Sequence, residues 1–365
     1  MHSICFVAPH AWPVLARDPG IKVIGGAEVQ QCILARLFAR QGHRVSMICL
    51  DHGQPARAVV DGVTVHKIFR MDEGMPVLRF LHPRLTSMWR ALGEADAGIY
   101  YYRSSAMWVG VVAEFCRRNG RRSIYAGASD KDFVPGAGGQ IALARDRWLY
   151  SRGLDAVDAI VAQNEAQVRS CRSHLGRDAV LIPSCYEPPP TGASEKDRVL
   201  WVGRIHPSKR PELLLELAER LPQLRFVLVG GAAQGEGMQA YYEGVRARAA
   251  RLANVECTGF LTLAEVEPWF DRARVLVNTS VFEGMPNTFL QAWARDIPTV
   301  GTVDVGADVH CFAGDVEALA RETLRLWGEA TGGQYKGYFE KNHSCAEVMR
   351  RYGRLFDDLR DRKAA

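Results

Sequence analysis

The feature that most constrains the fold is the alternation of short apolar runs with helical patterns in the second half of the chain. Short runs that are expected to form strands lie at 199–202, 225–229, 255–258, 275–277 and 299–300. Helical patterns separate them and follow the last one, at 211–221, before residue 251, at 264–274, 287–295 and 316–327. Strands that alternate with helices are typical of a parallel sheet covered on both faces. The second half is therefore predicted to be an α/β domain.

The first half repeats this alternation less regularly. Strands are expected at 4–8, 45–50, 63–68, 99–102, 123–126, 159–161 and 179–182, and helices at 27–40, 106–118 and 142–154. Residues 187–197 contain three consecutive prolines among polar residues, a composition typical of a linker. We therefore predict an α/β protein of two Rossmann-like domains, at 1–186 and 198–335, with parallel sheets that face each other across a cleft. Within 336–365, a helix at 346–359 with one apolar stripe is expected to pack back on the first domain.

Composition narrows the class of protein. A chain of 365 residues is too long for one ordinary core. Its net charge of +5 is mild and its basic residues are spread out, which argues against nucleic acid as the main partner but permits an anionic ligand or a membrane surface. The nine cysteines form no C-x-x-C pair, which argues against zinc and disulfide frameworks. No apolar run approaches the ~20 residues that span a bilayer, so we expect a cytoplasmic protein.

The stretch from Val275 to Ala294 is the strongest candidate for a ligand site. A strand breaks into Asn278-Thr279-Ser280 and Glu283-Gly284-Met285-Pro286-Asn287, and a helix with Gln291 follows. Ligands of open parallel sheets bind beyond the carboxyl ends of the strands, where helix N-termini also point. Pro286 suits the first helical turn, and Glu283 and Gln291 are spaced to reach one bound molecule. Alternatively, Glu283 only caps the helix.

Two further loops have residues suited to a phosphate. In 203–210, Arg204 offers a planar fork of donors and Lys209 a compact charge, a pair that suits two successive phosphates. In the first half, Gly25-Gly26 separates a strand and a helix, so backbone N–H groups there can approach a phosphate or sugar. The alternatives are a solvated basic loop for the first and a simple turn for the second.

Taken together, these residues resemble the retaining glycosyltransferases of family 4, which have the GT-B fold. The likeness rests on Gly203-Arg204 with Lys209, on Glu283-Gly284-Met285-Pro286-Asn287 with Gln291-Ala292, and on Gly25-Gly26, and it covers nearly the whole chain. It implies that a nucleotide diphosphate sugar binds in the cleft, mostly on the second domain, with no metal or other cofactor. By the resemblance, Arg204 and Lys209 neutralise the leaving diphosphate and Glu283 binds hydroxyls of the transferred sugar. Gln291 replaces a family glutamate that binds the ribose, and an amide can still accept that hydrogen bond.

The resemblance implies transfer, with retention, of a sugar to a glycan or lipid-linked oligosaccharide in polysaccharide or glycoconjugate biosynthesis. Fixed cations that stabilise the charge of a departing diphosphate agree with this chemistry. In the first half Asp130 is the candidate nearest the reacting sugar, and an Asx-type turn is its alternative reading. Two rival functions stay open: a nucleotide-sugar epimerase, and an inactive partner or regulatory subunit that binds a sugar nucleotide, which Gln291 motivates.

Two stretches, at 79–90 and 145–152, combine arginines with aromatic residues. A basic amphipathic surface of this kind would suit an acceptor held at the inner face of a membrane. Solvated helix faces with buried tryptophans explain both stretches equally well. Peripheral membrane contact therefore remains one of two interpretations.

Overall fold

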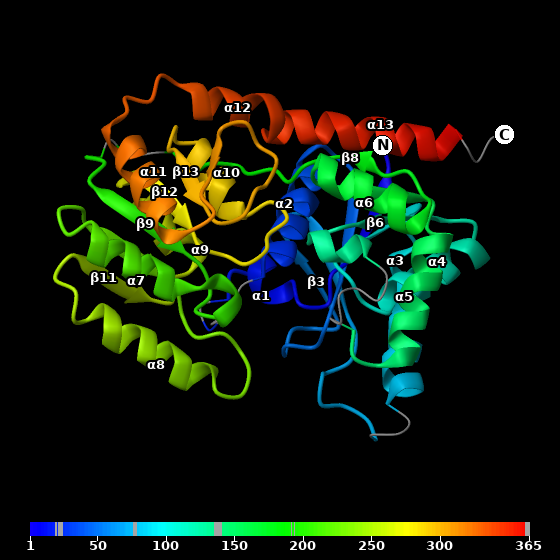
Figure 1. Ribbon diagram of the computed structural model, residues 1–365. Coiled ribbons are helices and arrows are strands. Elements are labelled where there is room, and N and C mark those ends of the chain that lie inside the picture. Colours follow the sequence, from blue (N-terminus) through cyan, green and yellow to red (C-terminus); the bar gives the residue numbers. More distant parts are fainter. Residues whose placement is uncertain are drawn as a thin grey trace. The chain divides into compact units, whose positions relative to one another are not determined.

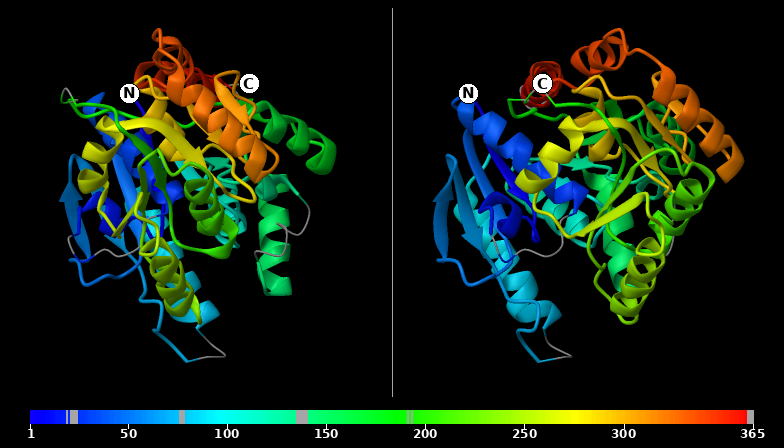
Figure 2. Two further views of the ribbon diagram at one scale, coloured as in Figure 1. Left: turned by 60° about the vertical axis from the view of Figure 1, so that its left-hand side comes forward. Right: turned by 90° about the vertical axis from the view of Figure 1, so that its left-hand side faces the viewer.

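The computed structural model describes residues 1–18, 20, 25–75, 79–134, 141–190, 192 and 194–361. It has the predicted α/β architecture, with two compact units that each contain a largely parallel sheet (Figure 1, Figure 2). Unit 1 comprises Met1–Asp18, Ile24–Ser184 and Val348–Ala365, and unit 2 consists mainly of Cys185–Glu347. Among the described residues no helix is long and apolar enough to cross a membrane.

Unit 1 has an eight-stranded sheet in the order β3-β4-β2-β1-β5-β6-β7-β8. Its strands are β1 (Ser3–Val7), β2 (Arg44–Cys49), β3 (Arg57–Val60), β4 (Val63–Lys67), β5 (Ile99–Arg103), β6 (Arg122–Ala126), β7 (Ala159–Ala162) and β8 (Val180–Leu181). Every neighbouring pair is parallel except β3 and β4. Strands β1, β5, β6 and β7 are almost entirely buried, as strands covered on both faces must be.

The helices of unit 1 are α1 (Trp12–Leu15), α2 (Gly26–Arg40), α3 (Thr86–Ala95), α4 (Trp108–Arg118), α5 (Ala144–Ala156), α6 (Glu165–Leu175) and most of α13 (Cys345–Asp361), with short turns η1 (Phe80–Leu85) and η2 (Asp130–Phe133). The apolar stripe of α13 packs on unit 1, where the rings of Tyr352 and Phe356 lie 5.8 and 5.2 Å from the ring of Phe38. This helix thus packs against Phe38, which lies more than 300 residues earlier in the chain.

Unit 2 has a six-stranded, all-parallel sheet in the order β11-β10-β9-β12-β13-β14. Its strands are β9 (Arg198–Val202), β10 (Phe226–Val229), β11 (Val255–Gly259), β12 (Ala273–Asn278), β13 (Thr299–Gly301) and β14 (His310–Phe312). Its helices are α7 (Pro211–Arg220), α8 (Met238–Ala249), α9 (Leu263–Asp271), α10 (Asn287–Trp293), α11 (Val316–Gly328) and α12 (Gln334–Asn342), and η4 (Pro207–Lys209) is a short 3₁₀ turn. The strand order reverses between β9 and β12, which makes this the topological switch point of the sheet.

Several elements differ from the sequence expectations. Strands β3 and β14 and helices α3 and α6 were not predicted; β3 is an edge strand whose residues alternate between exposed and half-buried, so its apolar signal is weak. Helix α10 begins at Asn287, where its predicted range starts, but Pro286 is not part of it. Pro286 has an extended ψ of 130° and stands just before the helix, so its expected place in the first turn is wrong.

Candidate functional site

The loops that follow β9 and β12 meet at the switch point of unit 2. These two strands are neighbours in the sheet, so their carboxyl ends deliver residues 203–210 and 279–286 to one edge. The backbone confirms that the loops touch, because the Val281 N–H donates to the Ser208 carbonyl at 2.9 Å. Open α/β sheets bind ligands at this position.

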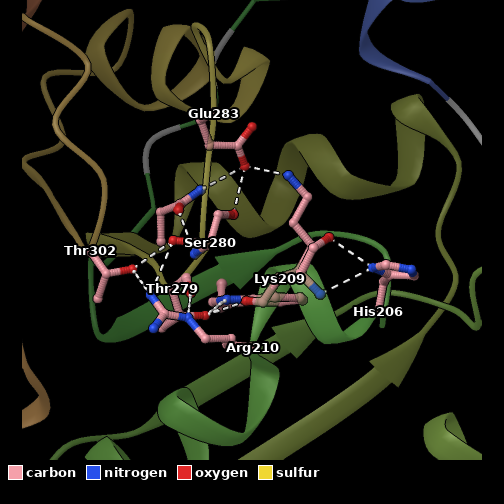
Figure 3. Close-up of polar contacts among 10 residues, drawn as sticks. His206, Lys209, Arg210, Thr279, Ser280, Glu283 and Thr302 are labelled. Carbon is pink, nitrogen blue, oxygen red and sulfur yellow. Dashed lines mark hydrogen bonds and ion pairs between the residues drawn. The ribbon is translucent and has the colours of Figure 1, made fainter. Parts of the chain in front are cut away.

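Lys209 and Glu283 form an ion pair at this edge (Figure 3). The Glu283 Oε1 atom accepts from Lys209 Nζ, from Ser280 Oγ at 2.6 Å and from Asn278 Nδ2 at 3.5 Å. The side chains are 24% and 15% exposed, so the pair is only partly screened by water. The N-cap residue of helix α10 is Pro286 and not Glu283.

Beside this pair, Arg210 lies on the loop after β9 and contacts residues that follow β12 and β13 (Figure 3). Its Nε donates to the Thr279 carbonyl at 2.8 Å, and its Nη2 donates to the Ser280 carbonyl at 3.2 Å and to Thr302 Oγ1 at 2.7 Å. Arg210 has a left-handed φ of 44°, an uncommon conformation for a residue with a side chain. Sequence reasoning missed this residue, because nothing distinguishes it there from the adjacent Lys209.

Hydroxyl and imidazole groups hold the Lys209 loop in place. Thr279 Oγ1 donates to the Lys209 carbonyl at 2.7 Å and accepts from Trp201 Nε1 at 2.9 Å. His206 Nδ1 accepts from the Ser208 N–H at 3.1 Å and lies 2.7 Å from Ser208 Oγ. These hydrogen bonds hold residues 206–209 of the loop in place. The backbone that carries Lys209 is therefore preorganised.

The glycine and arginine of the predicted phosphate loop lie at the same edge. A Cβ on Gly230, which follows β10, would lie 1.9 Å from the Gly203 carbonyl oxygen, so the two loops can approach only because this position has no side chain. Arg204 is exposed, and Gly284, Met285 and Pro286 are buried. The structure therefore places Gly203, Arg204, Lys209 and residues 283–287 at one edge of the sheet.

Gln291 has a different environment. It is 7% exposed, and its Nε2 donates to Glu267 Oε1 of α9 at 3.0 Å. Glu267 Oε2 also accepts from Arg295 Nη2 at 2.6 Å and from the Tyr186 hydroxyl at 2.7 Å. A glutamate at position 291 would bring a second carboxylate against Glu267, and the amide avoids this repulsion.

The candidates in unit 1 lie at two places. Gly25 precedes α2 as its N-cap and Gly26 is its first residue; a Cβ on Gly25 would lie 1.9 Å from Glu28 Oε2, so this carboxylate already covers the helix N-terminus. Asp130 Oδ1 accepts from Gln167 Nε2 at 2.8 Å and from Asn164 Nδ2 at 3.5 Å. The Asp130 side chain is therefore engaged by one residue of α6 and by the N-cap residue of that helix.

The turn around Asp130 is a capping box and not the Asx-type turn that was its alternative reading. The Ser129 hydroxyl accepts from the Lys131 N–H, and Asp132 Oδ2 accepts from the N–H groups of Ala128 and Ser129 at 2.7 and 3.0 Å. Asp132 is 1% exposed, and burial raises the pKa of its carboxyl group. Asp132 is a second carboxylate at this corner, in addition to Asp130. Sequence reasoning did not identify its role in the turn.

Comparison with known proteins places these units in one family. The model of the glycosyl transferase 4-like domain matches residues 25–185, and that of the glycosyl transferases group 1 matches residues 196–329. D-inositol 3-phosphate glycosyltransferase of Mycobacteroides abscessus is 25% identical over 267 residues, which are 64% of this chain. The match spans 59% of that relative's length.

Solved structures match the fold of nearly the whole chain. Sucrose-phosphate synthase of Thermosynechococcus elongatus is 17% identical with a TM-score of 0.75, and the match covers 98% of this chain and 99% of that one. HepE of Anabaena, in complex with UDP-glucose, is 14% identical with a TM-score of 0.72 and coverages of 98% and 100%. The fold is therefore GT-B. Together with the two family models, it makes this chain a glycosyltransferase of the family 4 type.

Proposed function

We propose that this protein transfers a sugar from a nucleotide diphosphate sugar to a glycan or lipid-linked acceptor, with retention at the anomeric carbon. The observation that carries the proposal is the Lys209–Glu283 pair at the switch point of unit 2, with Arg204 on the same loop. A cation paired with a half-buried carboxylate can exchange part of that contact for a phosphate. The same site then offers a carboxylate to the sugar.

Transfer requires that negative charge develop on the departing diphosphate. In our proposal Lys209 Nζ and the Arg204 guanidinium neutralise this charge, and fixed cations act most strongly where charge develops in the transition state. The three donors to Glu283 all reach Oε1. Figure 3 shows the other carboxylate oxygen pointing away from them, and we assign this oxygen to hydroxyls of the transferred sugar.

The remaining donor contacts are proposed from the loops around this pair. Backbone groups of Gly203 and of Gly284, Met285, Pro286 and Asn287 would line the donor, and Gly25 and Gly26 would contribute from unit 1. Gln291 would accept a ribose hydrogen bond through its carbonyl oxygen, since its Nε2 is directed to Glu267. The presence of UDP-glucose in HepE, which has the same fold, favours a uridine nucleotide as the first donor to test. We propose that the reaction needs no metal cofactor.

Thermal unfolding with UDP, GDP and ADP, each alone and as sugar conjugates, tests the donor site. A ligand at a hundredfold excess over its Kd stabilises a protein by about 2.7 kcal/mol. We expect one nucleotide to raise the Tm of the wild type and of Arg251→Ala, a control on an exposed arginine of the same unit. The shift should disappear in Arg204→Ala/Lys209→Ala. If the Tm shift persisted in this double variant, the donor would bind elsewhere on the protein.

Product analysis tests the reaction itself. With a labelled donor and an acceptor extract, we expect a glycoside whose anomeric configuration, read by NMR coupling constants, equals that of the donor. Interconversion of the free donor without an acceptor would instead identify an epimerase. Donor binding without transfer to any acceptor would favour the inactive partner, and an inverted product would refute retention.

A further inference from the structure

Two segments of unit 1 carry more positive than negative charge. Residues 74–93 contain three arginines and no acidic residue, and residues 141–152 contain three arginines and one aspartate. Their combined net charge of +5 equals that of all 365 residues. The residues outside these two segments are therefore neutral overall.

The two segments lie together in the structure. The guanidinium carbon of Arg145, in the first turn of α5, lies 3.5 Å from the centroid of the Phe80 ring, at the start of η1. Arg79 and Leu81, the neighbours of Phe80, are both exposed. One continuous surface therefore includes the start of η1 and the outer side of α5.

The packing of α5 fixes which of its side chains face solvent. A Cβ on Gly110 of α4 would lie 2.2 Å from the Leu149 carbonyl oxygen, and one on Gly153 would lie 2.4 Å from Gly110 N, so the two helix backbones are in contact. Positions 145, 148 and 152 are spaced by three and four residues and share one exposed face. This face presents an arginine, a tryptophan and an arginine in succession.

The exposed side chains of this surface are apolar as well as basic. Trp148 is 62% exposed, Leu143 is 58% exposed and Leu81 is 56% exposed. All eight tryptophans lie in the described part of the chain, and only Trp148 is exposed. Exposed large apolar groups beside arginines mark a surface that something else covers.

We propose that this basic-aromatic surface, formed by Arg79, Leu81, Leu143, Arg145, Trp148 and Arg152, binds the surface of a bilayer that contains anionic phospholipid. Tryptophan is enriched at the membrane interface, and arginine can extend its charge to the phosphates while its stem lies among apolar groups. The exposed leucines favour a bilayer over nucleic acid, since aliphatic side chains contribute to acyl contact and not to phosphate recognition. The inference does not depend on the donor site, because binding to vesicles needs no sugar nucleotide.

Co-sedimentation with vesicles tests the proposal. We expect the wild type to bind vesicles of phosphatidylcholine with one third phosphatidylglycerol at least ~10-fold more tightly than phosphatidylcholine alone, and less tightly in high salt. Arg79→Glu/Arg152→Glu should abolish this preference. The control Arg169→Glu/Arg251→Glu makes the same change in net charge at exposed arginines of α6 and of unit 2, and should bind like the wild type.

A second variant separates apolar insertion from charge attraction. Trp148→Ser should weaken binding to the anionic vesicles about fivefold, whereas Leu324→Ser, at a 40% exposed leucine of α11, should have no effect. If both arginine double variants lost binding to the anionic vesicles equally, net charge alone would drive binding. That result would overturn the proposal. Equal binding to both lipid mixtures, or tighter binding to a single-stranded oligonucleotide that Arg79→Glu/Arg152→Glu abolishes, would overturn it as well.

Discussion

Two corners of this protein place carboxylates just beyond the end of a parallel strand, and they use them differently. After β12, the half-buried Glu283 meets Lys209 and two neutral donors. After β6, the buried Asp132 accepts two backbone N–H groups of its own turn, and Asp130 accepts from two amide side chains. A carboxylate that satisfies the local backbone is committed to the fold. One that is paired with a lysine ammonium can exchange its partner for a ligand.

The largest difference should appear in catalysis. We expect Glu283→Gln to lower kcat/KM by ~10²–10³-fold, because a neutral amide stabilises a charged transition state poorly. Asp130→Asn should stay within about tenfold of the wild type, since an amide can still accept from Gln167. Steady-state transfer assays measure both. A comparable loss in Asp130→Asn would mean that both corners touch the reacting sugar.

The next effect concerns the stability of the unit 2 corner. Arg210→Ala removes three hydrogen bonds from a charged donor and should lower the free energy of unfolding by about 2–4 kcal/mol. Arg204, on the same loop, supplies the control. Because its side chain is exposed, Arg204→Ala should change the free energy of unfolding by less than about 0.5 kcal/mol. Urea unfolding compares the two. Similar values for both variants would show that Arg210 does not hold the strand ends together.

In unit 1, Asp132→Ala should lower the free energy of unfolding by about 1–3 kcal/mol, because the N–H groups of Ala128 and Ser129 lose their acceptor. Asp132→Asn retains a carbonyl oxygen and should recover part of this loss. Urea unfolding near neutral pH measures both variants. If the alanine variant were as stable as the wild type, the carboxylate would not be committed to the turn.

The smallest expected effect is a difference in pH dependence between the units. In unit 2, burial lowers the pKa of His310 to about 4, and its ring contacts Thr299 Oγ1 and the Val303 carbonyl, each at 3.0 Å. As the pH falls, His310 is protonated in the unfolded chain before it is protonated in the folded protein. Its contribution to the free energy of unfolding is therefore fully present above pH 6.5 and is lost as the pH falls toward 4. Asp132 behaves in the opposite way: its pKa is raised, so its contribution is fully present below pH 3.8 and is lost as pH rises through the folded-state pKa.

Between pH 7 and pH 5.5, the His310 contribution amounts to about 1 kcal/mol. Over this interval the wild type should therefore lose about that much more stability than His310→Gln, in urea unfolding at each pH. Asp132→Asn, compared with the wild type as the pH falls from 7 to 3.8, should show a difference of the opposite sign. Parallel curves for the wild type and His310→Gln would mean that His310 titrates normally in the folded protein.

Much of the fold could be predicted from sequence, because buried parallel strands such as β12 consist of continuous Val- and Leu-rich runs. The partly exposed strand β3 and the short edge strand β14 were missed, since their signal depends on neighbours far away in sequence. At the site, the motifs at Lys209 and Glu283 were visible from sequence, whereas their contact spans 74 residues and depends on strand order. The role of Arg210 depends on a left-handed backbone, and that of Gln291 on Glu267, and neither is encoded in a local pattern.

Helix α13 also sets an order of events during synthesis. Residues 348 onward belong to unit 1, and Tyr352 and Phe356 fill its core against Phe38. A chain emerging from the ribosome presents unit 2 in full before these residues appear, so the unit that is translated first is the one that finishes folding last. Until then its apolar surface around Phe38 remains uncovered, and a nascent chain that stalls in unit 2 exposes it to chaperones and proteases.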